Sequence, residues 1–270
     1  MQTKSFLKWA GGKSKLVPFI ENSLPKRPRK RLIEPFAGSA ALSLALEFDS
    51  YLLNDSNHDL IGLFQTLKQE KQQFIDYARS FFLPENNRED RFYELRAQFN
   101  RNTDRHERSA LFVYLNRHAF NGLCRYNSKG EFNVPFGRYK SPYFPEKEMQ
   151  GFIAKSERIE LLCGDFQVAL MQAEMHDMVY CDPPYAPLSD TASFTAYAQN
   201  SFNWEDQKRL AHTAKQTADT VQGVLISNHD TEFTREIYKD ARLETISVQR
   251  NIAAKSSSRQ KVGELLAIYA

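Results

Sequence analysis

Cysteine is scarce in this sequence, and the few cysteines present have no spacing typical of a metal site or a disulfide framework. Cys124, Cys163 and Cys181 are an odd number without a CxxC pair, and two of them lie in apolar runs that are typical of strands. We therefore expect reduced thiols. The histidines His58, His118 and His229 show no HxxxH or HExxH spacing, so we expect no bound metal.

Long uncharged apolar runs are also absent. No stretch approaches the roughly 18 residues of a membrane span, and the start of the chain leads to Trp9-Ala10-Gly11-Gly12 rather than to the apolar core of a signal peptide. We expect a monomer in the cytoplasm that does not associate with membranes. The 270 residues, 41% of them hydrophobic, are enough to bury a core.

The formal net charge of +3 is too small to indicate a polyanionic partner, but its distribution is uneven. Residues 108–140 include six basic side chains and a single acidic one, Glu131, and seven aromatic side chains are interleaved with them. Basic and aromatic residues together suit phosphate contacts and base stacking. We favour nucleic-acid binding here over a solvated charged face covering an ordinary aromatic core.

Strand-like and helix-like segments alternate at both ends of the chain, with a helical block between them. This pattern predicts an α/β protein with a Rossmann-like sheet, interrupted by a mostly helical insertion. We expect one domain from residues 1–57 and 146–270, and a second from residues 58–145. The predicted strands are 31–36, 51–55, 159–163, 178–181, 223–227, 243–250 and 264–269; the predicted helices are 40–48, 166–172, 204–220 and 232–240, with helical spacing from 60 to 82. Residues 255–259 read as a basic loop.

The most informative motif is Asp182-Pro183-Pro184-Tyr185, which follows the apolar run 178–181. Open α/β sheets place their ligands at the carboxyl ends of strands. Asp182 and the Pro183 carbonyl can accept hydrogens from an exocyclic amine, and Tyr185 can stack on a base. The motif therefore suits a planar aromatic amine, although a bland loop after a buried strand is the alternative.

A second motif lies after the first predicted strand. Gly38 precedes a helix whose free amides would face an anionic group, and Asp55 ends the next strand, where such folds place an acceptor for ribose hydroxyls. These positions predict a nucleoside cofactor. The segment Phe36-Ala37-Gly38-Ser39-Ala40 has one glycine where a dinucleotide fingerprint has three, which disfavours a pyrophosphate.

Taken in order, these motifs resemble the Dam family of DNA adenine-N6 methyltransferases, which modify adenine within GATC. The resemblance extends from about Phe6 to Tyr269, and it includes the segments 6–13, 121–127 and 132–137. It implies a methyl transfer from S-adenosylmethionine to a flipped adenine in double-stranded DNA. In-line transfer of this kind needs alignment rather than a metal or a covalent enzyme intermediate.

The resemblance also implies roles for individual residues. Those matching Trp9, Lys13, Asp55 and Asp182 contact S-adenosylmethionine, and the turn from Phe36 to Gly38 lines the same pocket. Those matching Asp182, Pro183, Pro184 and Tyr185 hold the adenine. The residue matching Phe120 enters the duplex, Leu123, Arg125 and Pro135 match residues that read base edges, and Lys8, Asn127, Arg138 and Tyr139 match residues that contact DNA.

Two positions depart from the family pattern. Ala40 stands where many relatives have a second glycine, and Phe120 stands where a tyrosine is familiar. We expect both changes to be tolerated. Two other activities would use much of the same sequence: methylation of adenine in structured RNA, and DNA binding by a non-catalytic regulator. The insertion favours duplex DNA, and Lys13, Asp55, Asp182 and Tyr185 favour catalysis.

Overall fold

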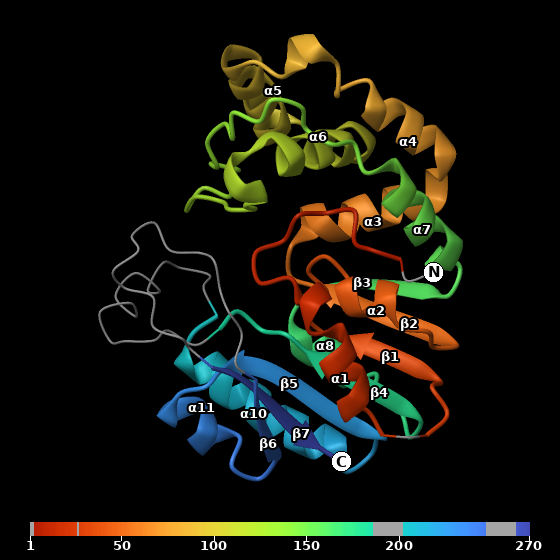
Figure 1. Cartoon of the computed structure of the whole chain (residues 1–270), viewed down its shortest axis with the longest axis vertical. Coiled ribbons are helices and arrows are strands. Elements are labelled where there is room, and N and C mark those ends of the chain that lie inside the picture. Colours follow the sequence, from red (N-terminus) through yellow and green to blue (C-terminus); the bar gives the residue numbers. More distant parts are fainter. Residues whose placement is uncertain (1–2, 26, 186–201, 247–262) are drawn as a thin grey trace. The chain divides into compact units, whose positions relative to one another are not determined.

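The computed structural model describes residues 3–25, 27–185, 202–246 and 263–270. The chain divides into two compact units (Figure 1): a helical unit, Met1–Leu24 with Ala37–Asp165, and a sheet unit, Pro25–Phe36 with Phe166–Ala270. The predicted loop at residues 255–259 and the end of the predicted strand 243–250 lie outside the described residues. The predicted domains, residues 1–57 with 146–270 and residues 58–145, follow the alternation of the predicted elements, and their boundaries stay a prediction.

Seven strands are ordered β3-β2-β1-β4-β5-β7-β6 in one sheet. Each predicted strand has a counterpart, so the predicted α/β class with a Rossmann-like sheet is confirmed. The strands are β1 (Arg31–Glu34), β2 (Ser50–Asp55), β3 (Ile159–Cys163), β4 (Asp177–Cys181), β5 (Gly223–His229), β6 (Arg242–Ile246) and β7 (Glu264–Tyr269).

The sheet unit holds β1, β4 and β5 in parallel, with β7 antiparallel to both β5 and β6. Every residue of β4 is buried, as expected of a parallel strand covered on both faces. The guanidinium of Arg31 on β1 donates to both carboxylate oxygens of Asp177 on β4, at 3.1 and 2.6 Å. Among its described residues, this unit contains the helices α8 (Phe166–Leu170), α10 (Trp204–Ala218) and α11 (Glu232–Ile237).

The helical unit packs its helices around α3, which contacts β2, β3, α4, α6 and α7. Three buried rings from distant parts of the sequence meet in its core: Phe6 contacts Phe64 and Phe152 edge to face, each at 5.8 Å between centroids, and the latter two stack at 5.1 Å. The remaining elements are η1 (Lys13–Lys15), α1 (Val17–Ser23), α2 (Ala41–Ala45), α3 (His58–Glu70), α4 (Gln72–Arg79), η2 (Pro84–Asn86), α5 (Glu89–Arg101), α6 (Arg105–His118), η3 (Phe120–Gly122) and α7 (Glu146–Ser156).

Helical spacing from 60 to 82 hides a break in the backbone. The segment is two helices, α3 and α4, separated at Lys71, whose φ is 52°. A left-handed residue interrupts the hydrogen-bond ladder without disturbing the apolar pattern, so periodicity does not reveal it. The helices α1 and α7 were not predicted; α7 buries only four of its eleven residues.

In the part of the chain that the structure describes, no helix is long and apolar enough to cross a membrane. The same residues contain no group of three or more His, Cys, Asp or Glu side chains that could hold a metal ion.

Candidate functional site

The turn after β1 places two backbone positions in the left-handed region. Gly38 has φ +46°, and Ala40, directly before α2, has φ 52°. The amide of Gly38 donates a 2.9 Å hydrogen bond to Oδ2 of Asp55, and the amide of Ala37 donates to the carbonyl of Asn54 at 2.7 Å. These bonds fix the turn to the end of β2.

Trp9 lies directly against this turn. A Cβ built on Gly38 would come within 2.7 Å of the indole Nε1 of Trp9, so only glycine leaves room for the ring. Lys13 is buried, and its Nζ donates to the carbonyl of Gly11 at 2.8 Å. A cavity in the same unit is lined by Trp9 together with Leu7, Gly12, Ser14, Ser39 and Ala41.

Asp55 supplies the acidic group at the end of β2. Its Oδ2 accepts from Gly38, and its Oδ1 accepts from the amide of Asn57 at 2.9 Å. Burial raises the pKa of this carboxyl, and the backbone hydrogen bonds oppose the rise. Because a carboxylate oxygen accepts more than one hydrogen bond, Asp55 retains capacity for a ribose hydroxyl. The indole of Trp9, the cradle at Gly38 and this carboxylate fit a nucleoside ligand.

Phe36, also predicted to line the cofactor pocket, belongs to the sheet unit. Its half-buried ring stacks on Phe166 at 5.3 Å between centroids and meets the ring of Phe202 edge to face at 5.4 Å. The ring is thus held in a small aromatic cluster at the end of β1.

Asp182, Pro183, Pro184 and Tyr185 follow β4 directly, as predicted. Pro183 is buried, while Asp182 and Tyr185 are half-buried. The hydroxyl of Tyr185 donates to Oε1 of Glu264, a buried carboxylate on β7. Burial, followed by the negative charges of Asp182 and Glu264, raises the pKa of Tyr185 far above its usual value, so the hydroxyl stays protonated.

Three buried side chains to which the sequence analysis gave no role, Gln207, Asn228 and Tyr238, support this loop. The carbonyl of Pro184 accepts from Nε2 of Gln207 at 2.8 Å, and Oε1 of Gln207 accepts from Nδ2 of Asn228 at 2.9 Å. The same amide of Asn228 donates to the hydroxyl of Tyr238 at 3.2 Å. The strand β5 runs two residues beyond its predicted end, which brings Asn228 into this chain. The only signal in the sequence is a glutamine among the apolar positions of α10.

Residues 119–137, which we call the recognition hairpin, follow α6. Two antiparallel bridges, Ala119 with Phe136 and Tyr126 with Phe132, hold its arms together. Asn127 organises the tip, where its carbonyl accepts from the amide of Gly130 at 2.9 Å and its Nδ2 donates to Glu131 at 2.8 Å. The Asn-, Gly- and Pro-containing segment that follows α6 therefore forms an ordered hairpin.

Arg125 is exposed on this hairpin. Its Nε donates to Oδ1 of Asn133 at 2.8 Å and its Nη2 donates to the carbonyl of the same residue at 3.3 Å. Leu123 is half-buried and Pro135 is exposed. The carbonyl of Pro135 accepts from the amide of Phe120 at 2.9 Å. Leu123, Arg125 and Pro135, the three predicted base-reading residues, therefore all lie in the recognition hairpin.

Phe120 begins η3, and Lys8, from a distant part of the sequence, lies against Gly122 at the end of the same element. The side chain of Phe120 is 49% exposed, which is unusual for a phenylalanine. Lys8 occupies the space where Gly122 would carry a Cβ, 2.4 Å from that position, and its Nζ lies 4.0 Å from the centroid of the Tyr139 ring. Asn116 of α6 fixes the backbone of Lys8 by two hydrogen bonds, at 2.8 and 2.7 Å.

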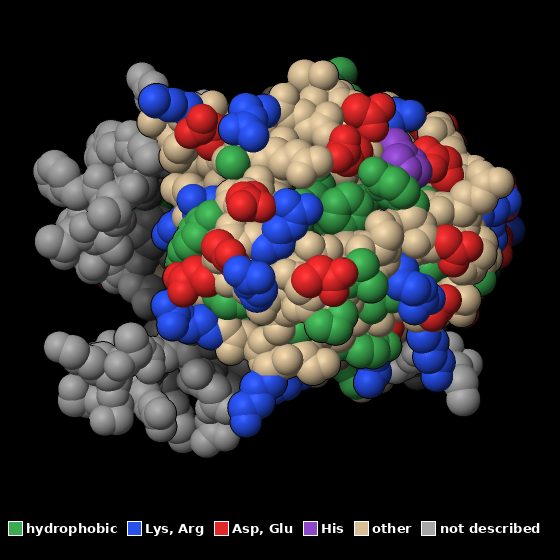
Figure 2. Space-filling model, turned by 90° about the horizontal axis from the view of Figure 1, so that it is seen from above, with side chains coloured by type: hydrophobic (Ala, Val, Ile, Leu, Met, Phe, Trp, Pro, Cys, Tyr) green, Lys and Arg blue, Asp and Glu red, His purple; other side chains and the backbone are tan. Residues whose placement is uncertain are grey.

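Arg138 forms an ion pair with an acidic side chain at the surface. Its Nη2 lies 2.9 Å from the carboxylate of Glu89, and both side chains are exposed. On the face drawn in Figure 2, Lys and Arg side chains are interspersed with Asp and Glu rather than gathered in a patch of one sign. Exposed pairs of this kind contribute little to stability, so their basic members can exchange a carboxylate for a phosphate.

The basic and aromatic stretch from 108 to 140 is only partly at the surface. Arg108 pairs with the buried Asp59, and Arg117 donates to the carbonyl of Phe6. The rings of Phe112, Tyr114 and Phe132 are buried in the core of the helical unit. The interpretation of this stretch as nucleic-acid binding therefore does not extend to these core residues, because composition does not distinguish a core aromatic from an exposed one.

The thiols show no sign of nucleophilic activation. Burial raises the pKa of Cys124 to about 12, and it also raises that of the fully buried Cys181. A protonated thiol is a poor nucleophile, which agrees with the expectation that neither thiol attacks a substrate.

A mixed sheet of this order, a glycine turn after β1, an acid ending β2 and Asp-Pro-Pro-Tyr after β4 together define the class of Rossmann-like methyltransferases. The chain belongs to the family of D12 class N6 adenine-specific DNA methyltransferases, whose family model matches residues 9–252. The suspected resemblance and the predicted enzyme class are thus confirmed, with DNA as substrate and a methyl donor as the second reactant.

Curated relatives match nearly the whole chain. It is 48% identical to the DNA adenine methylase of Vibrio cholerae serotype O1 over 98% of this chain and 96% of that protein. It is 49% identical to the DNA adenine methylase of Serratia marcescens over 99% of both chains. It is 47% identical to that of Escherichia coli (strain K12), covering 99% of this chain and 96% of that one.

Proposed function

We propose that this enzyme transfers a methyl group from S-adenosylmethionine to the N6 amine of a flipped adenine within GATC in double-stranded DNA. The family and the named relatives support adenine methylation in DNA. The cofactor and the GATC sequence are proposed from the fit of the site residues and from the motifs of the recognition hairpin. We further propose that the enzyme acts as a monomer in the cytoplasm.

Trp9, Lys13, Phe36, Gly38, Asp55 and Asp182 would hold the cofactor. S-adenosylmethionine supplies an electrophilic methyl group on a sulfonium centre. The contribution of the chain is to bind and orient, because a direct transfer between two aligned groups needs no enzyme-bound intermediate. Asp55 and the Gly38 turn suit the nucleoside part, since both are held by the hydrogen bonds described above.

Asp182 and the carbonyl of Pro183 act on the target adenine. The lone pair of its exocyclic nitrogen is delocalised into the ring, which makes the amine a poor nucleophile. Acceptors for both amine hydrogens favour a tetrahedral nitrogen and localise that lone pair. The carbonyl of Pro184 is held by Gln207, so the loop presents Asp182 and Pro183 from a fixed backbone.

Tyr185 provides the stacking platform for the extruded base. Its hydroxyl is tethered to Glu264, and this bond fixes the ring plane rather than acting on the amine. The placement of Asp182 to Tyr185 directly after the buried β4, with both the Pro184 carbonyl and the Tyr185 hydroxyl held by buried side chains, is the observation that carries the proposal.

In the recognition hairpin, Arg125 would donate to O6 and N7 of a guanine, and Leu123 and Pro135 would contact a thymine methyl group. Phe120 would enter the duplex beside the extruded base. Lys8, Asn127, Arg138 and Tyr139 would contact the DNA, with the basic members neutralising phosphates, so affinity should weaken as salt increases.

Labelled methyl transfer tests the proposal on three substrates: duplex DNA containing GATC, the same duplex with GATC scrambled, and structured ribosomal RNA. We expect label in N6-methyladenine of the GATC duplex alone. Equal labelling of the scrambled duplex would contradict the sequence assignment, and preferential labelling of RNA would contradict the substrate class.

Asp182→Ala should lower kcat by about a thousandfold or more while leaving DNA affinity nearly unchanged, because the side chain acts on the amine rather than on the duplex. Single-turnover methylation and fluorescence anisotropy measure the two quantities. Asp230→Ala is the matched control: it removes a carboxylate that follows β5 and pairs with Arg235. A wild-type rate in Asp182→Ala would remove that residue from the mechanism.

A further inference from the structure

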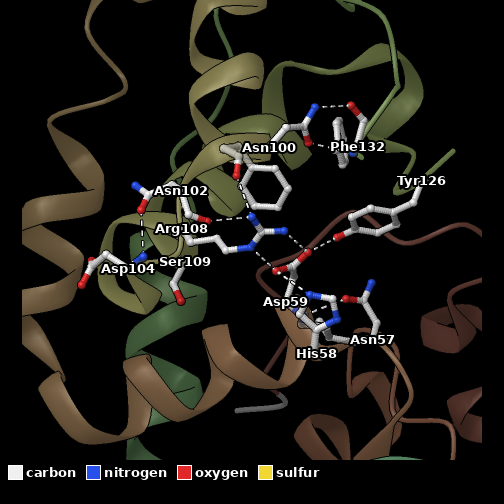
Figure 3. Close-up of polar contacts among 12 residues, drawn as sticks. Asn57, His58, Asp59, Asn100, Asn102, Asp104, Arg108, Ser109, Tyr126 and Phe132 are labelled. Atoms are coloured by element: carbon white, nitrogen blue, oxygen red, sulfur yellow. Dashed lines mark hydrogen bonds and ion pairs between the residues drawn. The ribbon is translucent and has the colours of Figure 1, made fainter. Parts of the chain in front are cut away.

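Asp59, the second residue of α3, is a buried carboxylate that joins three parts of the helical unit (Figure 3). Arg108 of α6 donates to both of its oxygens, from Nε to Oδ1 and from Nη2 to Oδ2, the latter at 3.0 Å. The hydroxyl of Tyr126, in the recognition hairpin, donates to Oδ2 at 2.7 Å. One carboxylate therefore connects α3, α6 and the hairpin.

Arg108 is itself held at each of its three guanidinium nitrogens. Its Nη1 donates to the carbonyls of Phe99 and Asn102, at 2.6 and 3.0 Å, and its guanidinium lies 4.1 Å from the centroid of the Phe99 ring. A planar guanidinium that donates from all three nitrogens has one orientation. It fixes Asp59 in turn, so the acceptor that Tyr126 meets is rigid.

The hairpin is also held on either side of Tyr126. Asn57 caps α3 through its side chain, donates through its backbone amide to Asp55, and places its Nδ2 3.7 Å from Sγ of Cys124. On the opposite arm, Asn100 of α5 exchanges two hydrogen bonds with the backbone of Phe132, at 2.8 and 3.1 Å. Cys124, before Arg125, is thus tied through its side chain to the N-cap of α3, and Phe132, after it, is tied through its backbone to α5.

We propose that Asp59, Arg108 and Tyr126 are positioning residues for base discrimination, because they fix the backbone from which Arg125 reaches the DNA. This inference rests on the base-reading role of Arg125 in the proposed function. A bidentate contact to guanine discriminates only if the guanidinium meets O6 and N7 in the right plane. A binding group must be held within about 0.5 Å of its productive position by the residues around it.

Tyr126 is the member of the cluster that can be changed most gently. Burial, with the negative charge of Asp59 nearby, raises the pKa of Tyr126 far above its usual value, so the hydroxyl remains a donor at every working pH. Replacing it with phenylalanine removes the hydroxyl with its bond to Asp59 and leaves the ring, which packs edge to face on Phe132 at 5.9 Å.

The test is the ratio of kcat/KM on a GATC duplex to kcat/KM on a duplex whose guanine is replaced. Tyr126→Phe should lower this ratio about tenfold, since a misplaced guanidinium loses part of its discrimination, while kcat on saturating GATC stays within about threefold of wild type. An unchanged ratio in Tyr126→Phe would overturn the inference.

Tyr51→Phe is the matched control for stability. The hydroxyl of Tyr51 donates to the carbonyl of Leu46 at 2.8 Å and accepts from the amide of Phe48 at 3.0 Å, at the opposite end of β2 from Asp55. Tyr51→Phe, like Tyr126→Phe, loses hydrogen bonds of a buried hydroxyl and should be less stable than wild type. It should nevertheless keep the wild-type ratio. Equal loss of discrimination in both variants would show a general effect of destabilisation and would also overturn the inference.

Arg125→Ala separates this inference from the proposed function. If Tyr126 acts through Arg125, the double variant should discriminate no less than Arg125→Ala alone, because the two changes are not additive. Full additivity would show that Tyr126 acts elsewhere. An unchanged ratio in Arg125→Ala would withdraw the base-reading role itself, and the positioning role with it.

Discussion

Gly38 is constrained both by its own backbone conformation and by the side chain that packs against it. Its φ is positive, and the indole of Trp9 occupies the space that a side chain would need. The left-handed conformation costs an L residue about 1–2 kcal/mol, and the steric overlap adds to that cost. The glycine is therefore required twice, by its own backbone and by its neighbour.

Gly38→Ala should reduce the free energy of unfolding by about 2–4 kcal/mol and should weaken cofactor binding, because Trp9 must move away from the turn. Urea unfolding and calorimetric titration with S-adenosylmethionine measure the two effects. Gly130→Ala is the control: its φ is +75°, and a Cβ there would meet no atom within 4 Å. Equal losses in the two variants would show that the indole contact contributes nothing.

At the residue scale, the sequence was enough to predict which residues belong to the candidate site. It was not enough to predict which side chains hold them in place. Asp182, Tyr185 and Asp55 are identifiable because a carboxylate or an aromatic directly after an apolar run has few structural reasons to be there. Glu264 and Gln207 are not identifiable, since they reach Tyr185 and Pro184 from 79 and 23 residues away. Such contacts depend on tertiary packing, which no local pattern encodes.

At the scale of elements, α10 links helix stability to the catalytic loop. Asn203 caps the helix by accepting from the amides of Glu205 and Asp206, and Asp206 completes a capping box. One turn further on, Gln207 holds the carbonyl of Pro184. The position of the loop therefore depends on how firmly the first turn of α10 is formed.

Asn203→Ala should lower the free energy of unfolding by about 1 kcal/mol, the usual effect of losing an N-cap, and should lower kcat several-fold. Thermal unfolding and steady-state methylation check both. Asp104→Ala removes the N-cap of α6, a helix of the helical unit that has no part in the chain of hydrogen bonds to Pro184 described above, so it should lose similar stability and keep its kcat. A matching loss of kcat in Asp104→Ala would contradict the link.

Elements were predictable where burial is continuous. The strands β1, β2, β4, β5 and β7 are apolar runs bounded by polar residues, and each lies close to its predicted position. The helix α7 was not predicted because only four of its eleven residues are buried. The break between α3 and α4 at Lys71 was not predicted, because a positive φ is rare for lysine and does not change the spacing of apolar residues.

At the scale of the whole molecule, His118 makes stability depend on pH. It is buried in the helical unit, stacks on Tyr114 at 3.9 Å between centroids and donates from Nδ1 to the carbonyl of that residue at 2.9 Å. Burial lowers the pKa of His118 from 6.5 to about 4. The folded chain therefore holds this imidazole neutral where the unfolded chain would protonate it.

The sign follows from proton binding. Below pH 6.5 the unfolded state binds a proton that the folded state refuses, so stability is complete above pH 6.5 and falls as pH decreases toward 4. We expect a loss of roughly 3 kcal/mol across this window. His118→Asn keeps a donor near the same carbonyl and should flatten this part of the profile. An unaltered slope in urea unfolding of the variant would assign the pH dependence to other groups.

The place of β7 constrains the order in which the enzyme can form during translation. This strand emerges from the ribosome after β6, yet it lies between β5 and β6 and pairs with both. Until it arrives, the nascent chain carries two open strand edges of the kind that invite aggregation. The same strand brings Glu264 to the hydroxyl of Tyr185. Completion of the sheet and completion of the base platform are therefore one late event, and a nascent chain that has not yet made β7 cannot hold that ring in place.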